Sequence, residues 1–391
     1  MKKGWVWKPL GDVCKTGSGG TPLSSRKEYY QGGKIPWLVS GEVAQGNVRE
    51  AKNFITKAGL ENSAAKIFPK DTVLVAMYGA TAGQVGILRF EAATNQAVCG
   101  IFPNDKFVPE FLFYFLLAKK DELVAQATGN AQPNISQVKI KNTVVPVPPL
   151  AEQQRIVGLL DEAFEGLATA KANAEKNLQN ACALFESHLQ SVFSQRGKGW
   201  VEYTLGDVFL TATGTTPPKN NAKFYGDFMP LAKPPELCDE PFDSAPDGLS
   251  KAGAAVARTL PAKSVLVSCI GNLGKIGLNI VPVAFNQQIN AILPDEKRAI
   301  PEFMFFQSLS PAFKEQLESL ASGTTVPIVN KSKFNSVRIV LPPLIIQKPV
   351  VSQLTALREE TQRLATLYTR KLAALEALKK SLLHQAFSGE L

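Results

Sequence analysis

The chain of 391 residues repeats itself, and this repeat constrains its fold more than any other feature. Short motifs return in the same order after an offset that drifts only between 191 and 195 residues. The matched pairs include Trp5 with Trp200, Leu10-Gly11-Asp12-Val13 with Leu205-Gly206-Asp207-Val208, Thr21-Pro22 with Thr216-Pro217, Tyr30 with Tyr225, Asn95-Gln96 with Asn286-Gln287, Pro109-Glu110-Phe111 with Pro301-Glu302-Phe303, and Pro148-Pro149-Leu150 with Pro342-Pro343-Leu344. An ordered series of this length indicates two copies of one structural unit.

The first 150 or so residues of each copy are typical of a mixed globular domain. Short β-branched runs at 72–75 and 264–267, bounded by Pro and Gly, predict strands. Apolar runs just after Pro109-Glu110 and Pro301-Glu302 predict buried helices that begin at a proline. Glycines at 79, 83 and 86, and again at 271, 274 and 277, predict a tight turn region.

Each copy ends in a stretch that predicts a long amphipathic helix. Apolar or small residues recur there at steps of three and four, which is typical of a heptad seam. The seam positions are Ile156, Leu160, Ala163, Leu167, Ala170, Ala174, Ala181, Leu184, His188 and Val192 in the first stretch, and Val350, Leu354, Leu357, Leu364, Tyr368, Leu375, Leu378 and Leu382 in the second. Pro349 is expected in the first turn of the second helix, where a proline removes no internal hydrogen bond.

These patterns predict an α+β fold with two similar globular domains, 1–150 and 196–344. Two long helices, 151–195 and 345–391, are expected to pack on each other as an antiparallel coiled coil that separates the domains, with an approximate two-fold axis. Forty-five helical residues would extend over roughly 68 Å.

Charge and composition favour a polyanionic partner. The net charge is +9, and the first 150 residues contain 18 of the 43 basic side chains but only 11 of the 34 acidic ones. No apolar run reaches the length of a membrane span and no signal segment is evident, so we expect a cytoplasmic protein without membrane contact. The five scattered cysteines predict buried free thiols in a reducing compartment.

The residue inventory argues against catalysis by this chain. The two histidines, His188 and His384, lie near the ends of the predicted long helices, where a structural role is expected. The segment Gly271–Ile276 has glycines too closely spaced for a phosphate loop and no Ser or Thr after its lysine, so we interpret it as a turn. We predict no cofactor and no metal site.

Several of the repeated motifs together resemble the specificity subunit of type I restriction-modification enzymes. The resemblance spans the whole chain, in both copies. The residues that carry it are Trp5 with Leu10-Gly11-Asp12-Val13, Gly20-Thr21-Pro22, Ile35-Pro36-Trp37, Gly79-Ala80-Thr81-Ala82-Gly83, Asn95-Gln96, the run from Pro148 to Ile156, and the ending from Ser381 to Leu391.

That resemblance implies a non-catalytic DNA-recognition subunit. Each globular domain would be a target recognition domain for one half of a bipartite, asymmetric site on double-stranded DNA. The helices would set the spacing and dock two methyltransferase (modification) subunits, and restriction/translocase subunits would join that core. The docking residues expected on the helices are Glu152, Gln153, Arg155 and Gln347. The second copy matches the first run only at Gln347, which would weaken one of the two partner contacts.

Base contacts are expected from polar side chains in loops, because these offer the bidentate geometry that base edges need. The candidates are Arg26, Lys27, Tyr78, Gln84, Gln132 and Asn134 in the first domain, and Lys219, Asn272, Lys275, Thr325 and Lys333 in the second. Asn95-Gln96 and Asn286-Gln287 are shared by domains expected to read different sequences, so we interpret them as structural.

Two other interpretations stay open from the sequence. A coiled-coil assembly scaffold would explain the long helices but not the basic first domain. A single-chain DNA methyltransferase or nuclease would need a catalytic constellation that the sequence does not display.

Overall fold

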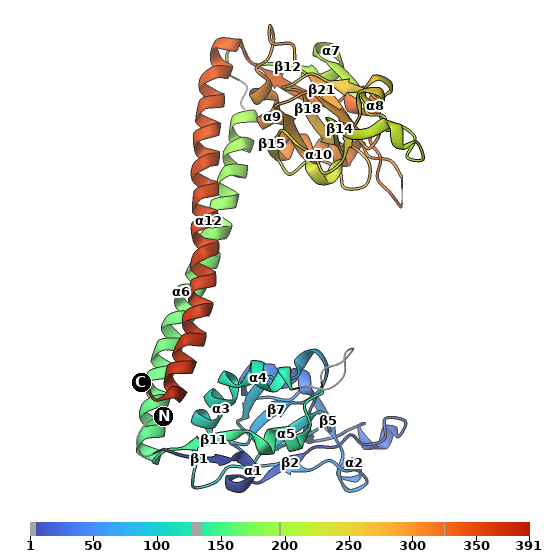
Figure 1. The fold of residues 1–391 in the computed structure, drawn as a ribbon. Helices are drawn as coiled ribbons and strands as arrows, with labels where there is room; N and C mark the ends of the chain where they lie inside the picture. The colour runs from blue at the N-terminus through green and yellow to red at the C-terminus, as the bar shows by residue number, and fades with distance from the viewer. Residues whose placement is uncertain (1–4, 127–133, 195–196, 324) are drawn as a thin grey trace. The chain divides into compact units, whose positions relative to one another are not determined.

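The repeat appears as two compact units in the computed structural model, which describes every residue except 1–4, 127–133, 195–196 and 324. Unit 1 comprises residues 1–173 and 371–391, and unit 2 comprises residues 174–370. Each unit holds one globular domain of mixed α and β structure and parts of two long helices (Figure 1). The predicted fold class, with two similar α+β domains and two long helices, is confirmed.

The described residues of unit 1 form three sheets and a few short helices. Its strands are β1 (Val6–Pro9), β2 (Thr16–Ser18), β3 (Ile35–Leu38), β4 (Asn47–Val48), β5 (Asn53–Ile55), β6 (Ile67–Phe68), β7 (Val73–Ala76), β8 (Val85–Leu88), β9 (Ala92–Thr94), β10 (Val98–Ile101) and β11 (Val144–Val147). Its short helices are α1 (Leu10–Val13), α2 (Lys57–Glu61), α3 (Pro109–Ala118), α4 (Lys120–Ala125) and α5 (Gln137–Asn142), with 3-10 turns η1 (Lys27–Tyr29), η2 (Ser40–Gln45) and η3 (Gly79–Thr81).

Unit 2 repeats this inventory closely. Its strands are β12 (Val201–Thr204), β13 (Leu210–Thr213), β14 (Tyr225–Ala232), β15 (Glu240–Phe242), β16 (Gly248–Leu249), β17 (Thr259–Leu260), β18 (Val265–Ser268), β19 (Ile276–Asn279), β20 (Val283–Phe285), β21 (Ile289–Leu293) and β22 (Arg338–Leu341). Its short helices are α7 (Leu205–Val208), α8 (Lys251–Val256), α9 (Pro301–Leu309), α10 (Pro311–Leu320) and α11 (Lys331–Asn335), with 3-10 turns η4 (Ala222–Phe224) and η5 (Pro234–Glu236).

The sheets of the two units have the same topology. The five-stranded sheets run β2-β10-β7-β8-β4 and β13-β21-β18-β19-β15, and the four-stranded sheets run β5-β3-β9-β6 and β16-β14-β20-β17. In each five-stranded sheet the last pair is parallel, β4 with β8 and β15 with β19, and its other pairs are antiparallel. The first and last strands of each domain pair separately, β1 with β11 and β12 with β22.

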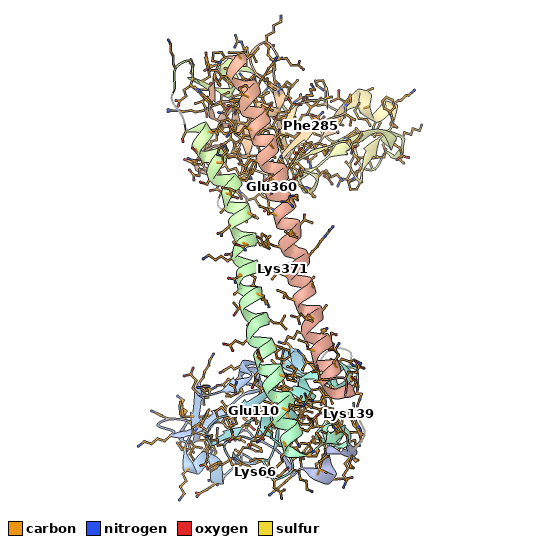
Figure 2. The ribbon with its side chains drawn as sticks, turned by 90° about the vertical axis from the view of Figure 1, so that its left-hand side faces the viewer. Lys66, Glu110, Lys139, Phe285, Glu360 and Lys371 are labelled. Carbon is orange, nitrogen blue, oxygen red and sulfur yellow. The ribbon has the colours of Figure 1, made fainter. Side chains whose placement is uncertain are left out.

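The predicted buried helices α3 and α9 begin at Pro109 and Pro301, and each packs on the five-stranded sheet of its unit. In unit 1 an ion-pair network joins α3 to that sheet. Arg89, which follows β8, donates to Asp71 at 2.9 Å and to Glu110 at 2.7 Å (Figure 2).

The predicted glycine turn is correct in its first part only. Gly79 and Gly83 have positive φ angles of 69° and 79°, and the equivalent Gly271 and Gly274 have 78° and 72°. Gly86, in contrast, lies inside β8 and Gly277 lies inside β19. A Cβ at position 86 would lie 2.7 Å from the Val43 carbonyl oxygen, so close packing, rather than a turn, requires glycine there.

The two long helices are α6 (Leu150–Phe193) and α12 (Leu344–Ser388). In unit 1, their segments run antiparallel: Arg155 donates to the Leu391 carbonyl at 2.9 Å, and Lys379 Nζ lies 5.4 Å from the centre of the Phe164 ring. In unit 2, the core contains Leu189 from α6 and Leu354 from α12.

The predicted seam is wrong at two positions, and the predicted place of Pro349 in the first turn of its helix is also wrong. Leu184 and Leu378 are exposed by 52% and 47%. Phe185 points inward instead, with its ring 6.2 Å from that of Phe306. Pro349 is the sixth residue of α12 rather than a first-turn residue, so it removes one helical hydrogen bond, the one to the Ile345 carbonyl. Among the described residues, no helix combines the length and hydrophobicity that a membrane crossing requires.

Candidate nucleic-acid interface

The turn after β7 and the segment before α5 meet in unit 1. Tyr78 and Asn134, which are both sequence-predicted candidates, form an isolated antiparallel bridge, and Ile135 N donates to the Met77 carbonyl at 2.8 Å. The Tyr78 side chain is exposed. The structure therefore places these two candidates side by side on the surface of unit 1. Gln132, predicted for the same loop, lies outside the described residues.

Unit 2 brings its equivalent loops together in the same way. Ile270 forms an isolated bridge with Ile328, and Gly271 N donates to the Pro327 carbonyl at 3.0 Å. Asn272 and Thr325, both exposed, lie in these two loops. Two of the five candidates of the second domain thus share one surface region.

A second loop pair, residues 21–30 and 216–225, contains Arg26, Lys27 and Lys219, all exposed. The loop is fastened identically in both units, because Tyr30 donates to the Pro22 carbonyl and Tyr225 to the Pro217 carbonyl, at 2.5 and 2.8 Å. Arg26 also pairs with Glu28 at 3.2 Å in an exposed ion pair.

The shared Asn-Gln pairs have structural contacts. Asn95 Oδ1 accepts from Ala97 N at 3.2 Å, and Asn286 Oδ1 accepts from Gln288 N at 3.1 Å. Gln287 accepts from Thr216 at 2.9 Å, and Gln96 accepts from Thr21 in the same way. These bonds tie the 21–30 and 216–225 loops to the sheets.

Three predicted candidates are engaged inside the fold. Lys333 Nζ donates to the Leu320 carbonyl at 2.8 Å and so caps the end of α10, just as Lys139 caps the Gln126 carbonyl in unit 1 (Figure 2). Gln84 is half-buried on a pocket beside α12. Lys275 is half-buried at the start of β19, and its backbone bonds to Ser268. Lys333 would have to give up its bond to the Leu320 carbonyl to contact a base.

Sequence reasoning missed one repeated element with surface lysines. Thr56-Lys57-Ala58-Gly59 returns as Ser250-Lys251-Ala252-Gly253, and the first residue of each caps a short helix by accepting from the glycine N at 3.1 Å. Each glycine lies so close to the preceding loop that a Cβ would collide with its backbone. Lys57 and Lys251 are both exposed, and Lys251 Nζ lies 5.5 Å from the centre of the exposed Phe228 ring. The offset of 194 residues was the signal that could have revealed them.

Comparison with known proteins identifies the family to which the two repeated domains belong. The model of the type I restriction modification DNA specificity domain matches twice, over residues 2–178 and 197–371. The chain belongs to this specificity family. Such subunits recognise DNA and are not themselves catalytic, so the resemblance drawn from the sequence is confirmed.

Specificity subunits named as such are among its relatives. The type I restriction enzyme MjaIX specificity subunit of Methanocaldococcus jannaschii is 24% identical and covers 100% of this chain and 94% of its own length. The HindI specificity subunit of Haemophilus influenzae is 32% identical over 52% of this chain and 47% of its own. A solved structure described as a basis of complex assembly and conformational transition of the type I R-M system matches with a TM-score of 0.83 at 21% identity, over 100% of this chain and 99% of that one.

The helix residues predicted to dock partners of this specificity subunit fall into two classes. Gln153 and Gln347 are fully buried, and both atoms of each amide bond to backbone of their own unit. Direct contact with a partner, as predicted, is therefore closed to these two glutamines. Glu152 and Arg155 lie on the other face of the helix and pair with each other through two bonds of 2.8 and 3.0 Å.

The thiols of the specificity subunit are free, as predicted, but two are not buried. Cys182 and Cys238 are exposed, whereas Cys14, Cys99 and Cys269 are buried. Burial raises the pKa of both Cys99 and Cys269 to about 12. These two thiols therefore stay protonated near neutral pH and are poor nucleophiles. Within the described part of the chain, no group of three or more His, Cys, Asp or Glu could hold a metal ion.

Proposed function

We propose that each unit of this specificity subunit reads one block of a bipartite, asymmetric DNA sequence. Supporting this is the contrast between a shared frame and different loop tips. The sheets, the capped helices α2 and α8 and the loop-fastening tyrosines are repeated, whereas Tyr78 and Asn134 are replaced by Ile270 and Ile328. Base identity is read by side chains, whereas backbone and phosphate contacts position the protein on DNA. Two domains with the same sheets but different loop side chains therefore suit two different DNA blocks.

The base-reading tips would be the exposed members of the two loop pairs. We assign Tyr78, Asn134, Arg26 and Lys27 to one block, and Asn272, Thr325 and Lys219 to the other. Lys57 and Lys251 would contact phosphate, because this lysine is repeated in both domains and phosphate contacts position a protein on DNA whatever sequence is read.

An exchange of recognition segments tests this assignment. Residues 1–150 are replaced by the matching segment of a related specificity subunit with a different target, and methylated positions are mapped across a host genome. One block is expected to change while the other and the spacer length stay the same. A change in both blocks, or in neither, would contradict separate reading. The exchange of 196–344 is the matched control and should alter the other block only.

We further propose that α6 and α12 set the distance between the blocks and carry two methyltransferase subunits, which restriction/translocase subunits then join. In this division, 151–195 and 345–391 are the spacing and docking segments, while 1–150 and 196–344 are recognition segments. The 44 residues of α6 amount to about 66 Å of helix, ample for two blocks one DNA turn of roughly 34 Å apart.

An insertion in both long helices tests the spacing role. Four residues, about one helical turn of 5.4 Å, are added after Asn173 and after Arg370, where the chain passes between units. The spacer between the blocks is expected to lengthen by one or two base pairs, because a base pair rises about 3.4 Å. An unchanged spacer with intact DNA binding would refute the proposal that the helices set the distance between the blocks. It would not contradict the proposal that each domain reads its own block.

A further inference from the structure

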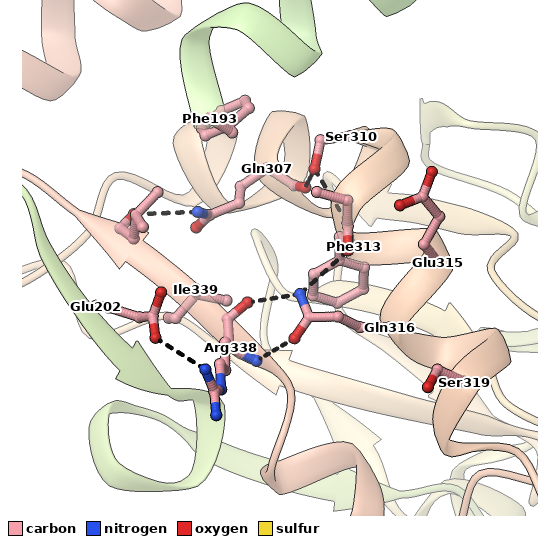
Figure 3. A pocket seen from close by; sticks show the side chains of 12 residues that line it. Phe193, Glu202, Gln307, Ser310, Phe313, Glu315, Gln316, Ser319, Arg338 and Ile339 are labelled. Carbon is pink, nitrogen blue, oxygen red and sulfur yellow. Dashed lines mark hydrogen bonds and ion pairs between the residues drawn. The ribbon is translucent and has the colours of Figure 1, made fainter. Parts of the chain in front are cut away.

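A pocket of about 490 Å³ lies in unit 2 where the junction of α9 and α10, strand β22 and the last residue of α6 meet (Figure 3). Its walls include Phe193, Gln307, Phe313, Glu315 and Arg338. None of these residues belongs to the loop pairs assigned to DNA. The pocket therefore needs its own explanation.

Gln307 is the most informative wall residue. Its side chain is only 4% exposed, and its Nε2 donates to the Val340 carbonyl at 3.1 Å. Its Oε1 is buried and has no hydrogen-bond donor among the described residues. A buried acceptor without a partner is costly, and native proteins rarely keep one without a reason. Because Gln307 also lines the pocket, a donor bound there is the natural partner to test for its Oε1.

The other polar groups of the pocket define the kind of donor. The N-terminus of α10, which would otherwise attract an anion, is already occupied, because Gln190 accepts from Ala312 N at 3.3 Å and Ser310 accepts from Phe313 N at 3.4 Å. Glu315 is exposed on the rim and has no ion-pair partner in the described part of the chain. The other carboxylate of the lining, Glu202, pairs with Arg338 at 3.5 Å. The unpaired Gln307 oxygen and the Glu315 carboxylate, in a pocket also lined by Phe193 and Phe313, suit a planar cation.

This chemistry is peculiar to the second copy. Unit 1 has a pocket of about 560 Å³ at the equivalent place, with Phe387 for Phe193, Trp7 for Glu202 and Phe115 for Gln307. That pocket is lined by four lysines, Lys119, Lys120, Lys379 and Lys380. Three carboxylates, Asp121, Glu122 and Glu376, line that pocket as well. What sets the unit 2 pocket apart is therefore the unpaired amide oxygen of Gln307 in place of the Phe115 ring.

We propose that the unit 2 pocket binds a guanidinium group, with Gln307 Oε1 accepting one of its N–H bonds and Glu315 balancing its charge. A guanidinium carries donors only and packs flat on aromatic rings, which no other protein cation combines. The group comes either from an arginine of a partner polypeptide or from a free small molecule. In the first case the proposal rests on the partner docking proposed above.

Capped arginine, N-acetyl-arginine amide, is the probe, with capped citrulline as its neutral, nearly isosteric control. Titration calorimetry on the full chain is expected to show binding of the arginine compound only, together with a shift of the Gln307 side-chain amide resonance. Q307L is expected to weaken binding by about tenfold or more, since a hydrogen bond to a charged group is lost. E315Q should weaken it less, and S319A, on the same rim, should bind as the parent does.

Equal binding of citrulline, or undiminished binding to a folded Q307L, would overturn the proposal. Q307L should fold, because Phe115 shows that the frame accepts an apolar side chain at this position; thermal melting checks this, and E315Q gives an independent answer. Loss of capped-arginine binding in the complex with modification subunits would assign the group to a partner arginine. Persistence of binding there would assign it to a free molecule. Neither binding measurement depends on recognition of DNA by the chain. A negative result for capped arginine would therefore leave the proposed reading of two DNA blocks intact.

Discussion

Gln153 and Gln347 make the same three hydrogen bonds in the two units. Oε1 of each accepts from a backbone N–H before the buried helix, Val108 at 2.9 Å and Ile300 at 2.8 Å. Nε2 of each donates to two carbonyls of its own domain, at 2.8 and 2.9 Å. The start of each long helix is thereby fastened to a globular domain.

Removing this fastening should be costly. Gln153→Leu leaves one N–H and two carbonyls without partners in a dry site, so we expect a loss of about 3 kcal/mol or more in the stability of unit 1. Denaturant unfolding followed by amide exchange of 108–115 measures it. Gln154→Leu, the same change at an exposed position one residue away, is the control and should change stability by less than about 1 kcal/mol. Equal effects of the two would argue against the fastening role.

Substitution of either of two glycines in α6 is expected to stabilise the protein. Gly158 and Gly166 are exposed, and a Cβ at either would meet nothing within 4 Å. Ala at each position should therefore stabilise the helix by about 0.5 to 1 kcal/mol. Gly253→Ala is the contrast, because its Cβ would lie 1.9 Å from the Phe224 carbonyl oxygen, and we expect it to destabilise the 216–225 loop. Thermal melting of the three variants compares them, and a destabilised Gly158→Ala would show that this face of α6 is covered.

Thiol reactivity should separate the five cysteines. At pH 8 iodoacetamide is expected to modify Cys182 and Cys238 in the folded chain, and all five thiols only after denaturation; mass spectrometry counts them. The raised pKa of Cys99 and Cys269 also predicts a pH dependence. Folding favours the protonated form of these two thiols. Their contribution to the free energy of unfolding is therefore complete below about pH 8.5, the pKa of an unfolded thiol, and it declines as the pH rises toward 12. Rapid labelling of either buried thiol at pH 8 would contradict their burial.

Three variants of unit 2 should behave in three different ways. Asn272→Ala should relax the preference at one base of one block by about 1 to 3 kcal/mol. Lys251→Gln should weaken binding to all sequences alike and reduce the salt dependence by about one ion. Lys333→Met, in contrast, should lower stability because the Leu320 carbonyl loses its cap. Binding of the assembled complex to single-base variants of the target, measured at several salt concentrations, distinguishes these cases. A base-specific effect of Lys251→Gln would show that this lysine contacts a base and not only phosphate.

The periodic and repeated parts of the sequence predicted structure well, and the parts that depend on three-dimensional partners did not. The proline-started helices and the long helices follow from local pattern, which indicates most but not all of the residues that face inward. Leu184 and Phe185 are adjacent apolar residues, and the choice between them depends on Phe306, some 120 residues away.

The candidate site was predictable in part for a similar reason. Loop position and exposure of Asn272 or Lys219 follow from turn chemistry, whereas the engagement of Lys333 depends on where α10 happens to end. The burial of Gln153 could not be predicted from the sequence, because a glutamine on an amphipathic helix is usually exposed. Only its satisfied hydrogen bonds explain why it lies inside.

Unit 1 is assembled from two distant pieces of the chain, since the rings of Phe111 and Phe115 pack against Phe387 at 5.3 and 5.4 Å. During synthesis the first 173 residues must therefore wait, with this apolar surface uncovered, until the ribosome has made the whole of unit 2. A chain interrupted before residue 371 would contain every strand of both domains and still leave the earlier one unfinished.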